Sequence, residues 1–434
     1  MSLNDLLKPF LTEYNSQNSV IMISSYPAKK DRSIKYLNAV ASYADHLTPE
    51  LNNSLVAKGK KLIILAEVLD GEEVYKENEV LVVRGWKRNS LFVFTQLMAV
   101  LSLFNNVSKV FLQFEFNMLG GASATGQLPL FLLTQKITGR DVTVLLHQVV
   151  ENLGDLSGHI GVGKKSVKLF VLQSFLNIFY RLALITSGKI VVHDEILRTR
   201  LNRLMTTNKV YVIPHGLGEY KNTCSLFDAR GKLGYSHDEF TILCFGFVTW
   251  YKGSDWVVDQ VSEFIKSNPK EKVKLVIAGG ESANLRTKPH YMKFYNDLKA
   301  KIDACPQITL TGFISDSDVQ YYFCAADVVI LPYRTQMSAS GPLAVTLSFN
   351  KPFLLSDRLL GALETEDIKN AMKDLNMGTE EVSFSLEGSD FFEKIKALKS
   401  NESYLNVLSD LSSLVREQRD WTVVSKKFLE VIEK

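Results

Sequence analysis

The stretch FTILCFGFVTWYKGSDWVVDQVSEFIK, residues 240–266, decides the fold class. Its first six residues, Phe240–Phe245, form a short apolar run that is typical of a buried strand. Residues Ser254–Lys266 have the spacing of an amphipathic helix, and a short turn with two glycines joins the two segments. A strand, a tight turn and a helix in this order indicate one repeat of a parallel sheet that is covered by helices.

The same alternation runs along both halves of the chain. The expected strands of the first half are 20–24, 61–66, 80–83, 109–114, 142–147, 189–192 and 209–213. Those of the second half are 240–245, 273–278, 308–311, 328–331, 353–356 and 382–384. The expected helices are 34–46, 89–105, 167–186, 254–266, 291–303, 316–325 and 343–349. This pattern predicts an α/β fold with two Rossmann-like parallel-sheet domains.

The boundary between the domains is expected within His215–His237, which is rich in glycine and polar residues and has no clear period. The last segment, Glu402–Lys434, is predicted as two helices, with Trp421 at the start of the second. We therefore predict domains at 1–216 and 217–416, followed by a C-terminal helix at 417–434. Two such halves that face each other across a cleft place ligands at the carboxyl ends of both sheets.

Composition excludes several classes of protein. The chain has 434 residues, of which 46% are hydrophobic and 22% charged, and its net charge is +3. A dedicated nucleic-acid binder is usually far more basic, so no nucleic-acid partner is expected. The four cysteines have no metal-ligand spacing and are interpreted as free thiols, and no metal is expected. The N-terminus lacks an apolar signal region, which favours a cytoplasmic location.

The first candidate site is the turn Phe245–Gly253, which contains Lys252. A helix N-terminus offers unpaired N–H groups and a partial positive charge, so an anion is stabilised there. Lys252 adds a full charge and is suited to neutralise a phosphate. The alternative is an ordinary turn with a solvated lysine, because a strand, a glycine and a helix are weak evidence by themselves.

The second candidate site follows the apolar strand Val328–Leu331. Ser340 is a suitable helix cap, Gly341 lets another molecule approach the backbone, and Pro342 suits a first helical turn before Leu343. Arg334 lies in the polar run before the cap and could support a bound anion. The alternative is a well-capped helix that binds nothing.

Two further turns in the second half have weaker signals. Gly279 follows one strand, and Phe313 and Ile314 lie between another strand and a capped helix. Their backbone is suited to contact the flat edge of a base. In the first half, one strand ends near Glu115, Gly120 and Gly121, and another ends at His147.

A strand-end histidine is more often structural than catalytic, and His193 and His215 also lie at strand ends. Position alone therefore does not single out His147.

Residues 161–209 contain nine basic residues and two acidic ones, a net charge of +7 over 49 residues. This basic stretch is interleaved with an apolar helix, in which Gln173, Asn177 and Arg181 recur at helical spacing. The pattern favours an amphipathic helix over a membrane span, and it suits peripheral contact with an anionic membrane at its inner face. A solvated face over a buried helix is the alternative.

Over nearly its whole length the chain resembles glycosyltransferase family 4, retaining enzymes with the GT-B fold. The resemblance rests on the order and spacing of several short segments: Tyr26-Pro27, Gln113–Gly121, His147, Val212–Gly216, Phe245–Gly253, Ile277–Gly280, Thr311-Gly312, Ala325–Tyr333 and Ser340–Leu343. It implies that the first domain binds the acceptor, that the second binds a nucleotide-diphosphate sugar, and that the final helix packs back on the first domain.

The resemblance also implies roles for individual residues. Lys252 and the helix opened by Ser340, Gly341, Pro342 and Leu343 hold the diphosphate from two sides, with Arg334 in support. Gly279, Phe313 and Ile314 lie on the base side. His147 contacts the donor sugar near the reacting carbon, and Tyr26, Glu115, Gly120 and Gly121 lie on the acceptor side. Neither a metal nor a cofactor is expected, because the lysine and the helix dipole supply positive charge.

The chain departs from the family pattern at the paired glutamates, whose positions fall on Met337 and Val345. Phe247 also stands where many members carry an arginine. Some relatives replace this segment with a Ser-Gly-x-Leu-Ala pattern, which residues 340–344 match. Three hypotheses follow: a retaining hexosyltransferase of glycan biosynthesis with a saccharide or lipid-linked acceptor, a catalytically silent subunit that regulates an active partner, and a nucleotide-sugar epimerase. No oligomeric state is predicted.

Overall fold

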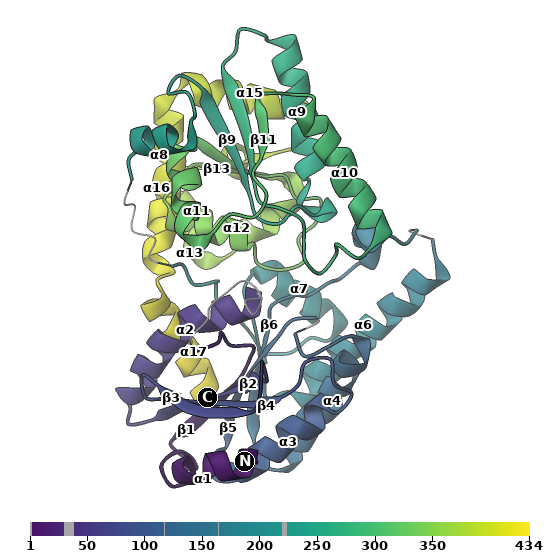
Figure 1. Cartoon of the computed structure of the whole chain (residues 1–434), viewed down its shortest axis with the longest axis vertical. Coiled ribbons are helices and arrows are strands. Elements are labelled where there is room, and N and C mark those ends of the chain that lie inside the picture. Colours follow the sequence, from purple (N-terminus) through teal and green to yellow (C-terminus); the bar gives the residue numbers. More distant parts are fainter. Residues whose placement is uncertain (1, 30–38, 117, 164, 219–223) are drawn as a thin grey trace. The chain divides into compact units, whose positions relative to one another are not determined.

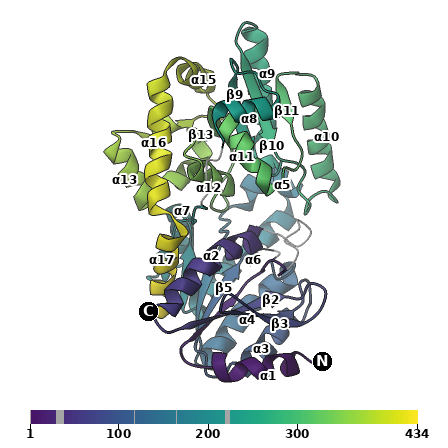
Figure 2. The same ribbon diagram turned by 60° about the vertical axis from the view of Figure 1, so that its left-hand side comes forward.

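The computed structural model describes residues 2–29, 39–116, 118–163, 165–218 and 224–434. Figures 1 and 2 show it from two sides. The chain forms two compact units: unit 1 comprises Met1–Glu151, Ser174–Gly216 and Trp421–Lys434, and unit 2 comprises Asn152–Gln173 and Leu217–Asp420. Residues 152–173, which we expected in the first domain, therefore belong to unit 2. The C-terminal segment of unit 1 begins at Trp421 rather than at residue 417.

Unit 1 is built on an eight-stranded sheet in the order β3-β4-β2-β1-β5-β6-β7-β8. The edge strand β3 is antiparallel to β4, and the other pairs are parallel. The strand order reverses between β1 and β5, so the loops after these two strands diverge there. The strands are β1 (Ser19–Ile23), β2 (Lys61–Glu67), β3 (Glu73–Glu77), β4 (Val80–Trp86), β5 (Lys109–Phe114), β6 (Asp141–Leu146), β7 (Lys189–Val192) and β8 (Val210–Val212).

Helices cover both faces of this sheet. Alternate strand residues, such as Val20 and Met22, pack with buried side chains of α2 and α17 in one apolar cluster. Their neighbours Ile21 and Ile23 point to the opposite face, where α3, α4 and α6 lie (Figure 1). The helices are α1 (Leu3–Tyr14), α2 (Ala39–Val56), α3 (Val93–Leu103), α4 (Ala122–Ile137), α6 (Val167–Thr186, of which the part up to Gln173 belongs to unit 2), α7 (Glu195–Leu204) and α17 (Trp421–Glu433).

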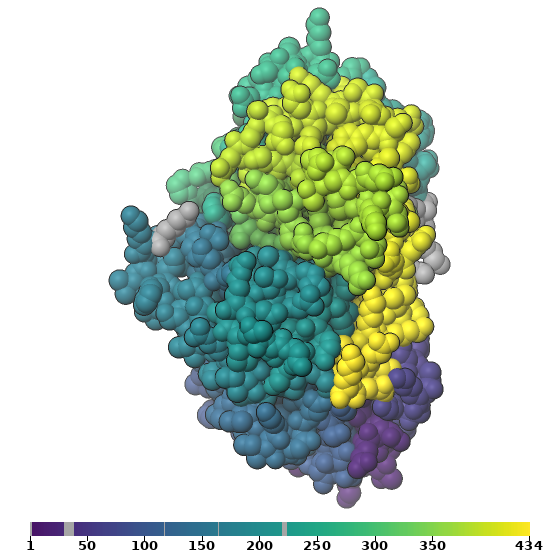
Figure 3. All heavy atoms as spheres, turned by 180° about the vertical axis from the view of Figure 1, so that it is seen from behind, coloured from purple at the N-terminus to yellow at the C-terminus, as the bar shows by residue number. Residues whose placement is uncertain are grey.

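The last helix, α17, is part of unit 1 although the residues before it belong to unit 2. Trp421, Val424 and Phe428 are buried in the cluster with α2. A Cβ on Gly216 would lie 2.4 Å from the Trp421 ring, so only a glycine fits at this point of contact. In Figure 3 the yellow C-terminal segment lies at the surface beside the purple N-terminal part of unit 1.

Unit 2 is built on a six-stranded parallel sheet in the order β11-β10-β9-β12-β13-β14. Its order reverses between β9 and β12, and in open α/β sheets ligands bind outside the carboxyl ends of the strands at such a switch point. The strands are β9 (Phe240–Phe245), β10 (Val273–Ala278), β11 (Ile308–Leu310), β12 (Val328–Leu331), β13 (Phe353–Ser356) and β14 (Ser383–Phe384).

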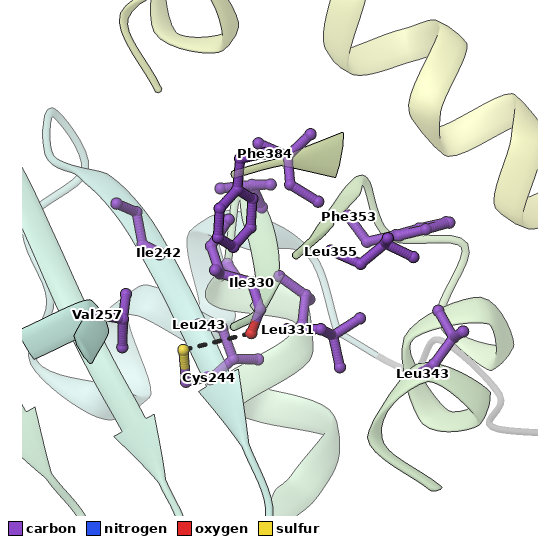
Figure 4. Packing of buried hydrophobic residues seen from close by; sticks show 14 of the residues in the cluster. Ile242, Leu243, Cys244, Val257, Ile330, Leu331, Leu343, Phe353, Leu355 and Phe384 are labelled. Carbon is purple, nitrogen blue, oxygen red and sulfur yellow. Dashed lines mark hydrogen bonds between the residues drawn. The ribbon is translucent and has the colours of Figure 1, made fainter. Parts of the chain in front are cut away.

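The core of unit 2 lies between this sheet and its helices. Figure 4 shows Ile242, Leu243 and Ile330 of the central strands packed near Phe384, with the Cys244 thiol 3.3 Å from the Ile330 carbonyl oxygen. The longer helices of the unit are α8 (Leu226–Leu233), α9 (Ser254–Ser267), α10 (Pro289–Asp303), α11 (Asp316–Ala325), α12 (Gly341–Ser348), α13 (Glu366–Asp374), α15 (Asp390–Ser400) and α16 (Glu402–Gln418). Its short helices are η1 (Leu153–Leu156), α5 (Ser157–Ile160), η2 (Trp250–Lys252), η3 (Asp357–Leu363) and α14 (Thr379–Val382).

The predicted fold class is confirmed, because both units are α/β layers on mostly parallel sheets. All thirteen expected strands are present within one to three residues of their expected ends. The edge strand β3 was missed because its residues, Glu73–Glu77, are mostly polar and half-buried and lack an apolar run. Residues 34–38 of one expected helix lie outside the described residues, as do Asn117 and Lys164 of the motifs above.

Candidate functional site at the switch point of unit 2

Two loops meet at the switch point of unit 2. The first, residues 246–253, follows β9, and the second, residues 332–340, follows β12. The loops contact closely: a Cβ on Gly253 would lie 1.9 Å from the Pro332 carbonyl oxygen, and Gly253 itself has a left-handed φ of 74°. A residue other than glycine would clash here, so Gly253 is required for α9 to begin where it does.

The Lys252 ammonium lies at the centre of this site. A Cβ on Gly246 would lie 2.9 Å from Lys252 Nζ and 3.2 Å from a ring carbon of Pro342, in the first turn of α12. Among the described residues, the ammonium has no hydrogen-bond or ion-pair partner. Burial lowers the pKa of Lys252 to about 8, so the side chain still carries its charge at neutral pH. An uncompensated cation in such a position attracts an anion.

The start of α12 offers fewer backbone N–H groups to an anion than the sequence predicted. Ser340 caps the helix, and its hydroxyl accepts a hydrogen bond from the Leu343 N–H at 3.2 Å. That N–H is therefore occupied, and Pro342 has none. Of the segment from Ser340 to Leu343, the exposed Gly341 is the residue that presents a backbone N–H group to a ligand. The Leu343 side chain is buried in the core, and contact of its backbone with a diphosphate remains a prediction.

The guanidinium of Arg334 has several partners within the protein. It forms a two-pronged ion pair with Asp255 of α9, at 2.7 and 2.8 Å, and donates a further bond to the Trp250 carbonyl oxygen. It also lies 4.9 Å from the centre of the Trp250 ring. Through these contacts Arg334 positions the Lys252 loop, and direct contact with a diphosphate remains a prediction for Arg334.

The loops expected on the base side are close-packed around glycines. A Cβ on Gly279 would lie 2.0 Å from the Gly246 carbonyl oxygen, and one on Gly280 would lie 2.9 Å from the Phe313 nitrogen. The Gly279 N–H donates to Thr311 Oγ1 at 3.1 Å, so it is not available to a base. Phe313 is 51% exposed and presents its ring to solvent, whereas Ile314 packs partly against the core.

One neighbouring element was not predicted at all. The segment from Leu153 to Ile160 packs on the turn that carries Lys252: a Cβ on Gly158 would lie 2.5 Å from the Trp250 ring, and the His159 ring meets Tyr251 edge-on at 5.2 Å. Burial, and then the charge of His290, lower the pKa of His159 to about 4. No sequence pattern links residues a hundred positions apart, although Gly158 and Gly161 mark a place of close approach.

In unit 1, His147 lies at the end of β6 with both ring nitrogens engaged. Its Nε2 is 3.0 Å from Gln113 Oε1, and its Nδ1 is 3.3 Å from His193 Nε2. Burial, and then the charge of His215, lower the pKa of His147 to about 3, so the ring is neutral at physiological pH. This environment does not suit proton transfer, and contact with a donor sugar remains a prediction for His147.

The three strand-end histidines form one cluster, which the sequence did not reveal. The ring of the fully buried Tyr43 lies 4.9 to 5.2 Å from the rings of His147, His193 and His215, and 5.0 Å from Trp421. The parallel register of neighbouring strands brings these histidines together. The cluster ties the strand ends of unit 1 to α17.

Glu115 and the glycines after β5 lie at the switch point of unit 1. Glu115 accepts a hydrogen bond from Gln148 at 2.6 Å, and burial raises its pKa to about 7 despite the nearby charge of Arg88. Gly120 has a φ of 153° and packs against the Asn89 backbone. Gly121 is exposed and precedes the first turn of α4.

Tyr26 is buried shortly after the end of the strand β1. It is 5% exposed and belongs to the apolar cluster with α2, and burial raises the pKa of its phenol. The buried Arg84 donates to the carbonyl oxygens of both Tyr26 and Pro27, and Glu67 accepts from the Tyr26 N–H. The Tyr26-Pro27 motif therefore shapes the loop after β1, and a place for Tyr26 on the acceptor side remains a prediction.

The residues that the structure describes contain no group of three or more side chains suited to hold a metal ion. The four cysteines are free thiols. The groups that the structure gathers at the unit 2 switch point are therefore one ammonium, the first turn of α12 and several closely packed loops.

Residues 239–372 match a family model described as "Glycosyl transferases group 1". Similar solved structures are a sucrose-phosphate synthase from Thermosynechococcus elongatus (13% identity, 96% of this chain and 98% of that one, TM-score 0.68) and a glycosyltransferase from Rickettsia africae (14%, 97% and 98%, 0.64). A third is the Anabaena protein HepE in complex with UDP and glucose (11%, 96% and 99%, 0.62). Comparison with curated proteins by sequence found no match. These likenesses show that the chain has the GT-B fold.

Proposed function

We propose that this protein is a retaining glycosyltransferase that moves a hexose from a nucleotide-diphosphate sugar to a saccharide or lipid-linked acceptor. The observation that carries the proposal is the Lys252 ammonium, which has no partner among the described residues and lies beside the first turn of α12, at the switch point of unit 2. A diphosphate satisfies both groups at once. It neutralises the ammonium, and it accepts a hydrogen bond from the exposed Gly341 N–H at the positive end of the helix dipole.

The likeness to known proteins supports a nucleotide as the ligand. The family match, residues 239–372, spans both loops of the site. HepE, which has a similar fold, has been crystallised with UDP, with UDP and glucose, and with UDP-glucose. The half of the chain that contains Lys252 is therefore the proposed donor-binding unit, and the proposed acceptor-binding unit contains Glu115, Gly120 and Gly121.

The proposed reaction needs no protein nucleophile. The acceptor hydroxyl oxygen bonds to C1 of the sugar on the face from which the nucleoside diphosphate departs, and the bond between C1 and the phosphate oxygen breaks. The hydroxyl proton passes to the departing phosphate oxygen, which leaves a glycoside and a nucleoside diphosphate. Lys252 stabilises the negative charge that grows on the phosphate, which makes it the proposed catalytic residue of unit 2.

A catalytically silent subunit is the second candidate, and one observation favours it. Met337 and Val345 stand where the resemblance expects two glutamates, and Val345 packs partly against the core of unit 2. Without these carboxylates the contacts to the sugar and the ribose must come from other groups. A silent subunit binds the nucleotide and does not turn over its sugar. An epimerase releases UDP-sugar isomers rather than a glycoside, so product analysis separates all three hypotheses.

We further propose a cytoplasmic location with peripheral attachment to an anionic membrane, and a reaction that uses no metal or cofactor. Sugar transfer that continues in the presence of a chelating agent supports a reaction without a metal.

The test of the donor site is a calorimetric titration with UDP and GDP. Lys252→Ala is expected to weaken nucleotide binding by about 1.5–3 kcal/mol, which is the range for a hydrogen bond to a charged group. The matched control is Lys266→Ala, which removes an exposed lysine from the far end of α9. It should leave the affinity unchanged. Equal affinity in the Lys252→Ala variant and the parent protein would refute the proposed role.

A further inference from the structure

One surface of unit 1 is unusually apolar. Three side chains of α4 and four of α6 are exposed: Leu130 (64%), Leu133 (40%), Ile137 (75%), Phe175 (36%), Ile178 (56%), Leu182 (42%) and Ile185 (52%). We call these seven residues the apolar face. On each helix they recur every three or four residues, so they form one stripe per helix. Figures 1 and 2 show α4 and α6 on the same side of the unit 1 sheet.

The two stripes are neighbours. At one end, a Cβ on Gly126 of α4 would lie 3.6 Å from the Phe175 ring of α6. At the other end, Lys136 of α4 and Thr186 of α6 line the same groove. The residues of α6 before Ser174 belong to unit 2, and among them Val171, Phe170 and Val167 are also 58 to 78% exposed. The helix rises about 1.5 Å per residue, so the stripe from Phe175 to Ile185 in unit 1 is roughly 15 Å long.

The fold does not need these side chains. The opposite sides of both helices supply the core of unit 1, with Leu128, Phe131 and Leu132 from α4 and Phe179, Tyr180 and Leu184 from α6, all nearly inaccessible to solvent. A contiguous exposed apolar surface in addition to a complete core indicates an interaction site.

The charges on these helices select the partner. Neither α3, α4 nor α6 contains an aspartate or a glutamate, whereas Lys136, Lys168 and Arg181 are exposed. Within the described part of the chain these three cations form no ion pair. An apolar stripe flanked only by cations is typical of a helix that lies in the interface of an anionic bilayer.

The burial of helix α6 favours a position on a membrane surface over one across a membrane. The helix is long and apolar enough to span a bilayer, but 39% of its most apolar window is buried in the protein. Lipid cannot surround this helix unless unit 1 opens, since Phe179 and Leu184 pack against the sheet.

We propose that the apolar face of α4 and α6 inserts into the outer part of an anionic bilayer and docks unit 1 on its surface. This inference extends the proposed function, because a docked unit 1 meets a lipid-linked acceptor in the plane of the membrane. It does not depend on sugar transfer, since vesicle binding and nucleotide binding are measured separately.

The test is co-sedimentation of the full chain with phosphatidylcholine vesicles, with and without phosphatidylglycerol. The parent protein is expected to sediment only with the anionic vesicles, and less at high salt. The double variant Leu130→Gln/Ile178→Gln should lose at least tenfold in binding. The matched control, Val56→Gln/Leu226→Gln, removes two exposed apolar side chains from α2 and α8 and should bind as the parent does.

Two measurements keep the result interpretable. UDP affinity by calorimetry should be unchanged in the Leu130→Gln/Ile178→Gln variant, and if that variant fails to fold, Ile137→Gln at the exposed end of α4 replaces it. The proposal is overturned if the parent protein ignores vesicles, binds neutral and anionic ones equally, or loses binding equally in the control. It is also overturned if the face variants instead break up a dimer in light scattering, because the face is then a protein interface.

Discussion

At the scale of single residues, the two switch points hold ionisable groups that are kept in unfavourable surroundings. Lys252 carries an ammonium with no partner among the described residues, and Glu115 carries a carboxyl whose pKa burial raises to about 7. Ionisable groups with shifted pKa values are often found where ligands bind, because the ligand supplies the charge or hydrogen-bond partner that the protein does not. The free energy of unfolding of the Lys252→Ala variant at pH 7 should therefore be at least as high as that of the parent protein. A loss of nucleotide binding in this variant then reflects the missing ammonium and not unfolding.

Glu115 makes the stability of unit 1 depend on pH. Between pH 4.5 and about 7 the folded protein holds a proton that the unfolded chain releases, so stability falls as pH rises through this window. Glu115→Gln should remove this dependence, since Gln148 can still donate to the amide oxygen. We expect the variant to exceed the parent by up to about 3 kcal/mol at pH 8 and to match it near pH 4.5. Urea unfolding at both pH values measures this, and a difference that does not change with pH contradicts it.

At the scale of elements, glycines decide how closely the loops of unit 2 approach each other. Gly279 contacts the Gly246 carbonyl oxygen, and Gly246 lies beside the Lys252 ammonium. The position of the Lys252 ammonium therefore depends on the packing of the loop after β9 against the loop after the neighbouring strand β10.

Gly279→Ala is expected to destabilise unit 2 by about 2 kcal/mol or more and to weaken UDP binding, because its methyl group clashes with backbone that cannot move alone. The matched control is Gly231→Ala in α8, where a Cβ meets nothing within 4 Å and alanine favours the helix. Thermal unfolding with and without UDP gives both quantities. A Gly279→Ala protein as stable as Gly231→Ala contradicts the packing argument.

At the scale of the whole molecule, the chain has two apolar cores, and the core of unit 1 takes part of its residues from the C-terminus. Each unit can therefore unfold in its own transition. A nucleotide bound at Lys252 should raise the melting temperature of unit 2. At a nucleotide concentration one hundred times Kd, it should raise the free energy of unfolding of this unit by about 2.7 kcal/mol.

Phe428→Ala should lower the other transition, since the loss of a buried phenylalanine costs about 3–5 kcal/mol. For a unit of this size the melting temperature falls by roughly 10 °C. The control is Val423→Ala on the exposed side of α17, where Val423 is 37% exposed. Calorimetry resolves the two transitions. If Phe428→Ala lowers the transition that UDP raises, α17 does not belong to the core of unit 1.

The sequence by itself determined most of the strands, several of the helices and the main candidate residue. Apolar strands, helical spacing and capping residues are local signals, and they predicted the parallel sheets, α12 with its Ser340 cap, and Lys252 at the turn after β9. The final helix could be placed because Trp421 begins a separate amphipathic pattern.

Only the tertiary structure decided which partners these residues have. Arg334 pairs with Asp255, 79 positions away, and Tyr26 is buried beneath α2. The segment from Leu153 to Ile160 packs on Trp250, and three histidines surround Tyr43. The physical reason is common to all four cases. The partners of a side chain are set by strand order and by packing between distant segments, and the local sequence pattern predicts neither of them.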